Sequence, residues 1–166
     1  MKLSLRKLSV SAVLTALALI LSFVESQIPV FLPLPGAKVG LANIVTLFAL
    51  YRLGIGYAVA VQAVRVSLSS ILFGSFASFV YALSGAALSL CLMILVRLLP
   101  RISKITVSIV GGVSHNIAQI AAASLMLGTN AVAYYLPFLL ITGTVAGTVI
   151  GVAGALLINK IPRFVI

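Results

Sequence analysis

The stretch YLPFLLITGTVAGTVIGVAGALLI, residues 135–158, carries no charged side chain over its 24 positions. An α-helix needs about 20 predominantly apolar residues to cross the hydrocarbon core of a bilayer. This stretch therefore predicts a membrane-spanning helix. Within it, Gly143, Gly147 and Gly151 recur at every fourth position, a spacing that lets two helices approach closely. We expect this glycine face to pack against another helix of the same chain.

Similar apolar runs fill the rest of the chain. Of its 166 residues, 63% are hydrophobic and 7% are charged, whereas soluble domains carry about a quarter charged residues. The solvent of these runs must therefore be lipid. We predict an all-α fold, a polytopic membrane protein of about six transmembrane helices in a single domain over residues 1–166. The expected helices are approximately 8–27, 39–53, 57–73, 78–99, 105–127 and 135–158.

The basic residues predict the orientation of the chain in the membrane. Cytoplasmic loops are enriched in Lys and Arg. With the N-terminus inside, nine of the eleven basic residues fall on the cytoplasmic side, while Lys38 falls outside and Arg65 lies within a helix. Both termini are therefore predicted to be cytoplasmic, and the net charge of +10 needs no nucleic-acid partner to explain it. The nine are Lys2, Arg6, Lys7, Arg52, Arg97, Arg101, Lys104, Lys160 and Arg163.

Arg65 is the sharpest candidate for a functional residue. It lies near the middle of the third predicted helix, with Gln62 on the same face, and ionisable side chains at such depth are costly and often functional. The chain has no aspartate, so Glu25 is its only internal carboxylate partner. Arg65 is either a clamp for a carboxylate or phosphate ligand, or part of a structural pair with Glu25 or backbone carbonyls. Glu25 itself binds a ligand amine, pairs with Arg65 or Lys38, or contacts interfacial water.

A second polar group lies in the fifth predicted helix. His115, Asn116 and Gln119 fall within about one helical turn, and His115 and Gln119 share a face. Such groups are costly in lipid unless they line a cavity or form hydrogen bonds between helices, and both readings are open. We do not expect a metal site, because one histidine without Asp or Cys partners offers too few ligands. Cys91 lies in an apolar run and is expected to be small apolar filler.

The sequence lacks the motifs of the common catalytic classes. It contains no Walker motif for ATP, no aspartate pair to hold Mg²⁺ on a diphosphate, and no Ser/His/Asp set. We therefore expect neither an enzyme nor a cofactor.

Several stretches of the sequence carry a resemblance to a known family. The chain resembles the Gx transporter family, also called heptaprenyl diphosphate synthase component I, and the matching stretches span most of its length. That family is similar to the substrate-binding S components of energy-coupling factor (ECF) transporters, which are small six-helix proteins. The stretches are LPGAKVGLAN (34–43), residues 65–74, YALSGAA (81–87), SHNIAQ (114–119) and YYLP (134–137).

The resemblance implies a substrate-binding subunit of an ECF-type transporter in the bacterial cytoplasmic membrane. Such a subunit captures a small vitamin-like or anionic molecule from outside, under the Pro-rich first loop of residues 29–36. Its partners are a transmembrane coupling subunit, which S components often meet through small residues such as Ala12 and Ala16, and two ATPase subunits. The alternative is a non-catalytic accessory subunit of heptaprenyl diphosphate synthase in isoprenoid-quinone synthesis. The expected substrate-binding residues are Arg65, His115, Asn116, Gln119, Glu25, Lys38 and Asn43.

Overall fold

The structure, a computed structural model, describes residues 5–27 and 40–161. Over these two ranges the chain is helical apart from short turns, which confirms the predicted all-α class. Lys38 and the Pro-rich first loop lie outside the described residues. The elements are α1 (Leu5–Gln27), α2 (Asn43–Arg52), α3 (Ile55–Phe73), α4 (Phe76–Arg97), α5 (Lys104–Leu127), the 3₁₀ helix η1 (Asn130–Tyr135) and α6 (Leu136–Lys160).

Five of these helices are long and apolar enough to cross a membrane. They are α1, α3, α4, α5 and α6 with its preceding 3₁₀ turn. Large apolar side chains stand exposed along their outer faces, for example Ile71 on α3 and Leu125 on α5. Such surfaces are stable only against lipid, so the chain is a multi-pass membrane protein.

The predicted spanning helix over residues 39–53 is shorter than expected. At 1.5 Å per residue, the ten residues of α2 extend about 15 Å, half of the hydrocarbon core of about 30 Å. A turn precedes α2, and Gly40 in this turn has a φ of +83°, which a helix cannot contain. The described residues between α1 and α3 therefore form a half-length helix inside the bundle instead of a sixth full-length spanning helix.

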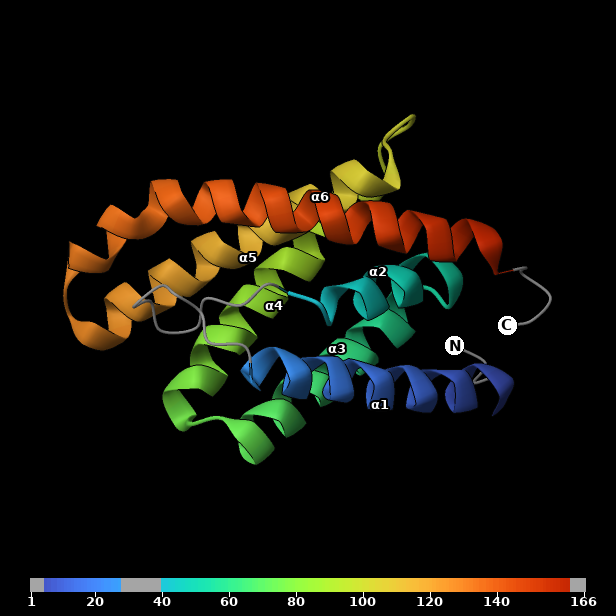
Figure 1. The fold of residues 1–166 in the computed structure, drawn as a ribbon, viewed down its shortest axis with the longest axis horizontal. Helices are drawn as coiled ribbons and strands as arrows, with labels where there is room; N and C mark the ends of the chain where they lie inside the picture. Colours follow the sequence, from blue (N-terminus) through green and yellow to red (C-terminus); the bar gives the residue numbers. More distant parts are fainter. Residues whose placement is uncertain (1–4, 28–39, 162–166) are drawn as a thin grey trace.

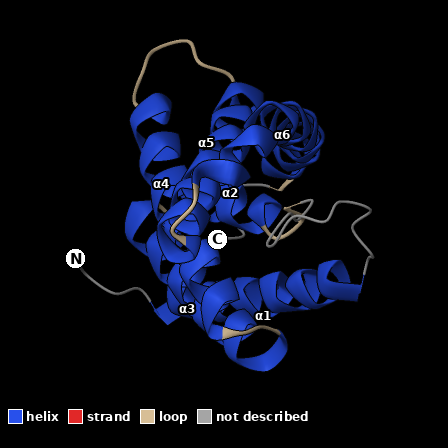
Figure 2. Ribbon diagram, turned by 90° about the vertical axis from the view of Figure 1, so that its left-hand side faces the viewer, coloured by secondary structure: helices blue, strands red, loops and turns tan. Residues whose placement is uncertain are grey.

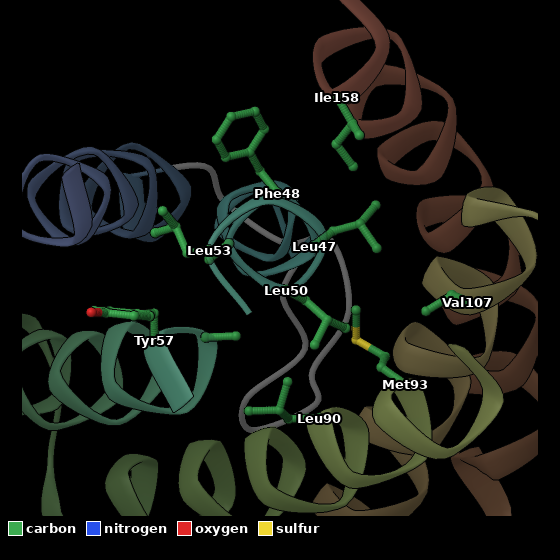
Figure 3. Close-up of a cluster of buried hydrophobic side chains, with 11 residues drawn as sticks. Leu47, Phe48, Leu50, Leu53, Tyr57, Leu90, Met93, Val107 and Ile158 are labelled. Carbon is green, nitrogen blue, oxygen red and sulfur yellow. The ribbon is translucent and has the colours of Figure 1, made fainter. Parts of the chain in front are cut away.

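The core of the molecule is built around α2. Residues 45–50 are all buried, on every side of the helix. Figure 3 shows Leu47 and Leu50 pointing toward Met93 of α4 and Val107 of α5, with Ile158 of α6 above. A short helix can be apolar on all sides because the longer helices enclose it.

The longer helices form two groups on either side of α2. In Figures 1 and 2, α1 lies beside α3, and α4, α5 and α6 form the second group. The most extensive contacts join α5 to α6 and α4 to α5, and α3 packs against α4 to connect the two groups.

Glycines set the close approach of α5 and α6. A Cβ atom at Gly147 would lie 2.7 Å from the Cα atom of Ile109, and one at Gly112 would lie 2.6 Å from the carbonyl oxygen of Gly143. Gly151 likewise faces the backbone of Ile105. The predicted packing of the glycine face within the chain is confirmed.

Basic side chains gather at one end of the bundle. This end holds the start of α1, the end of α2 and the end of α6 (Figure 1). Arg97 donates a hydrogen bond of 2.6 Å to the carbonyl oxygen of Leu50, and Lys104 donates one of 2.8 Å to the side chain of Asn159. The clustering agrees with the orientation that the charges predict, with this end toward the cytoplasm.

Candidate ligand-binding site

A cavity of about 420 Å³ lies between α5 and α6. Met93 of α4 and the turn that precedes α2 complete its wall. Ligand cavities typically have about 300–1,000 Å³, mostly apolar walls and a few polar groups. This cavity has that character, because only five side chains in its lining carry a polar group. They are Asn43, Ser108, His115, Asn116 and Thr142.

The small residues of α5 and α6 shape the cavity. Gly111, Gly112, Gly143 and Gly147 all contribute to its lining, so backbone forms much of the wall between the two helices. Apolar side chains of α6 complete the wall. They are Leu139, Ile141, Val145, Ala146, Val149 and Ile150.

Asn116 connects the cavity wall to α6. Its Nδ2 donates a hydrogen bond of 2.7 Å to the carbonyl oxygen of Leu139, which also accepts one of 3.2 Å from Thr142 Oγ1. A Cβ atom at Gly143 would lie 2.8 Å from the same Nδ2. Asn116 is therefore an interhelical hydrogen-bonding residue whatever else it contacts.

His115 lies between the cavity and α4. A Cβ atom at Gly85 of α4 would lie 2.7 Å from the Cε1 atom of the imidazole, so the ring fills the space that this glycine leaves. Sequence reasoning did not select Gly85. The available signal was the run of small residues around it, Ser84–Ala87, which is unusual for a helix that faces lipid on one side.

The turn before α2 forms one edge of the cavity. Gly40, Leu41 and Asn43 line it from this side, and the side chain of Ile150 lies close to Gly40. The backbone N–H of Gly40 donates a hydrogen bond to the carboxylate of Glu25 on α1. Glu25 therefore fixes the turn that bounds the cavity without lining the cavity itself.

Arg65 belongs to a separate group of polar side chains, which we call the Arg65 cluster. Its guanidinium donates to Gln62 Oε1 at 3.1 Å and to Ser22 Oγ at 3.4 Å. Gln62 Oε1 also accepts a hydrogen bond of 2.6 Å from Thr46 of α2. Glu25 is near enough for its charge to act on Arg65. The cluster thus joins α1, α2 and α3 around the chain's one acidic side chain.

The structure therefore divides the predicted substrate-binding residues. Asn43, His115 and Asn116 line the cavity, while Arg65 and Glu25 lie in the Arg65 cluster. Gln119 is buried on α5, one turn beyond His115, and does not line the cavity. Ligand contact by any of these residues stays a prediction. Sequence reasoning missed Met93, Ser108 and the apolar wall of α6, since apolar residues in a spanning helix give no signal of lining a cavity.

Two further predictions concern metals and partners. Among the described residues, no three His, Cys, Asp or Glu side chains come together as a metal site. Ala12 and Ala16, the predicted partner interface, are both exposed on α1. Their face of α1 is open to lipid or to another protein.

Comparison with known proteins adds one finding. A sequence model described as heptaprenyl diphosphate synthase component I matches residues 14–157. The chain belongs to the heptaprenyl diphosphate synthase component I family. The match runs from α1 to near the end of α6, so the residues that form the cavity and the Arg65 cluster, and those of α2, lie within the matched range. Comparison with curated proteins and with solved structures gave no match.

Proposed function

We propose that this protein is a non-catalytic membrane subunit that holds a mainly apolar ligand for partner proteins of prenyl diphosphate synthesis. The observation that carries the proposal is the cavity between α5 and α6 in a chain of the component I family. A prenyl chain is a branched hydrocarbon, and apolar walls of Leu, Ile, Val and Met would bind it through the hydrophobic effect. His115 and Asn43 are polar side chains of the lining that would orient its polar end.

The proposed division of labour follows from the chemistry that the sequence lacks. Paired carboxylates hold the Mg²⁺ ions that neutralise a diphosphate, and this chain has a single acidic side chain. That residue, Glu25, accepts a hydrogen bond from Gly40 and is near enough to Arg65 for its charge to act there. The word "component" in the family's name implies a second subunit, which would supply the catalytic carboxylates. The present chain would bind isoprenoid in the membrane and present it to that subunit.

A second candidate function is supported by α1. Ala12 and Ala16 leave a small-residue face exposed, and small-residue faces are typical of close contacts between membrane helices. A transport subunit of the ECF type would use such a face to meet its coupling subunit, and the cavity would hold the transported molecule. In that case the physiological partners would be ATPases rather than a synthase.

The test measures thermal stability of the purified protein in nanodiscs against two sets of compounds. One set is prenyl alcohols and prenyl diphosphates of increasing length, and the other is water-soluble vitamins. Ligands that bind only the folded state raise its melting temperature. We expect an increase of a few degrees with isoprenoids. Ala146→Phe, which fills the cavity from α6, should abolish the increase, and Ala121→Phe on the exposed face of α5 should preserve it.

The two candidate functions differ in what deletion of the protein does to cells. Loss of long prenyl products with unchanged uptake supports the synthase subunit, and loss of uptake with unchanged prenyl products supports the transport subunit. Stabilisation by a vitamin and by no isoprenoid would overturn the first proposal. If isoprenoids stabilised the Ala146→Phe variant and the parent protein equally, the cavity would not be the binding site.

A further inference from the structure

A second hollow, of about 260 Å³, lies at the basic end of the bundle. We call it the basic hollow. It is formed where α2 and α6 end and α5 begins, so it is separate from the cavity in the middle of α5 and α6. Its lining residues are Tyr51, Arg52, Lys104, Ile158 and Asn159.

The two cations of the basic hollow are held in place by neutral partners. Arg52 donates hydrogen bonds to the carbonyl oxygens of Ile158 and Ile161, at the end of α6. Lys104 donates to Asn159 Oδ1 at 2.8 Å, and its ammonium group lies 6.0 Å from the centre of the Tyr51 ring. Carbonyl and amide oxygens orient these side chains but do not neutralise their charge.

Further positive charge lies beside the basic hollow, whereas the one acidic side chain of the chain lies elsewhere. The guanidinium of Arg97 lies 4.9 Å from the centre of the Tyr51 ring, and Lys160 follows Asn159 on α6. The only acidic side chain, Glu25, binds Gly40, which precedes the opposite end of α2. Cations that no carboxylate neutralises create a positive potential that attracts anions from solvent or from the membrane surface.

We propose that the basic hollow binds a phosphate-bearing anion. Its volume is below the usual 300–1,000 Å³ of sites for drug-sized ligands, which favours a compact group over an extended molecule. Arg and Lys are the side chains that bind phosphate oxygens best, through charge-assisted hydrogen bonds. The phosphate comes either from an anionic phospholipid headgroup or from a soluble diphosphate. This proposal is independent of the ligand proposed for the cavity.

The orientation of the chain alone does not account for this arrangement. The positive-inside rule requires Lys and Arg on one side of the membrane, but it does not require them to share a hollow. Lys160 and Lys104 satisfy that rule equally, yet only Lys104 lines the basic hollow. This pair therefore provides a matched comparison between a charge at the site and a charge beside it.

The experiment uses the full chain in nanodiscs and compares Lys104→Gln with Lys160→Gln. In nanodiscs of phosphatidylcholine, binding of inorganic diphosphate is measured by titration. In mixed nanodiscs, native mass spectrometry measures how much phosphatidylglycerol stays bound after release. We expect one of the two anions to bind. Lys104→Gln should weaken its binding about five-fold, the effect of removing one cation near a membrane surface, and Lys160→Gln should weaken it less than two-fold.

Two further variants distinguish anion binding in the basic hollow from attraction by the overall positive charge of this end of the bundle. Lys104→Arg keeps the charge and should retain binding, and Asn159→Ala releases the Lys104 side chain and should weaken binding. Melting of each variant without anion checks that it is folded. Binding of diphosphate identifies a soluble source, and retention of phosphatidylglycerol identifies a lipid source. Absence of both, or equal weakening by Lys104→Gln and Lys160→Gln, would overturn the proposal.

Discussion

The cavity between α5 and α6 and the Arg65 cluster between α1, α2 and α3 hold polar side chains in different ways. The polar side chains of the cavity lining include no Asp, Glu, Lys or Arg, and they lie among glycines and apolar side chains. The Arg65 cluster contains charge, and its guanidinium hydrogen-bonds to Ser22 and Gln62. A charge inside a membrane protein needs several partners, which occupy the space around it. Neutral groups need fewer, so they can border an open space.

The difference bears on the two readings of Arg65. An anion clamp would present the guanidinium to a ligand cavity, whereas Arg65 does not line the one between α5 and α6. Its hydrogen bonds and its nearby carboxylate are what a structural role requires, and ligand contact by Arg65 stays a prediction. The polar residues that line the cavity are instead His115, Asn43 and their neighbours, so these are the ones placed for ligand contact.

The largest expected effect tests the glycine packing that forms the cavity wall. Gly147→Val would place a branched side chain where even a Cβ atom lies 2.7 Å from the backbone of Ile109. Because two helix backbones cannot easily separate, we expect a loss of folded protein, measured by size-exclusion chromatography and circular dichroism. Val152→Leu, on the exposed face of α6, should fold normally. A normally folded Gly147→Val protein would show that the α5–α6 contact is looser than described.

A smaller effect tests the charge in the Arg65 cluster. Arg65→Met removes the cation near buried Glu25 and should lower the free energy of unfolding by about 3 kcal/mol, the cost of leaving a buried charge without its nearby cation. Glu25→Gln in the same protein should restore part of this loss. The measurement is reversible unfolding in mixed micelles, with Lys160→Met as the exposed control. Strictly additive effects of the two substitutions would contradict a coupling between Arg65 and Glu25.

The smallest effect tests the neutral hydrogen bond beside the cavity. Asn116→Ala removes the donor to the carbonyl oxygen of Leu139 and should cost about 0.6 kcal/mol, and less than about 2 kcal/mol, as interhelical hydrogen bonds do in membranes. Thr142 continues to donate to the same oxygen, which limits the loss. Thr144→Ala, whose hydroxyl bonds only within α6, is the control. A loss as large as that of Arg65→Met would mean that neutral and charged groups contribute alike.

The bounds of the long helices that span the membrane were predicted well from the sequence. The predicted bounds of 57–73 and 105–127 differ from α3 and α5 by two residues or fewer at each end, because long apolar runs bounded by glycine or basic residues have one stable conformation in a bilayer. The region of 39–53 was predicted less well. Composition cannot distinguish a helix that spans the membrane from a half-length helix enclosed by others, since both are apolar on all sides.

The candidate site was predicted only in part. Polar residues in apolar runs are conspicuous, so His115 and Asn116 could be selected from sequence, as could Arg65. Their division between the cavity and the Arg65 cluster could not, because it depends on which faces of α3 and α5 meet which neighbours. The place of Ala146 or Met93 in the cavity wall could not be predicted either, since an apolar side chain in a membrane helix faces lipid, core or cavity with the same composition.

By itself, the sequence determined that lipid surrounds the helices, that the fold is all-helical, and that most basic residues of the chain favour the cytoplasmic side of the membrane. These properties follow from composition and charge along the chain, because the cost of exposing backbone and charge to lipid acts on each segment separately. Only the tertiary structure decided that α2 is enclosed, that glycines bring α5 against α6, and that a cavity and a basic hollow lie at different depths. These features arise from distances between segments far apart in the sequence.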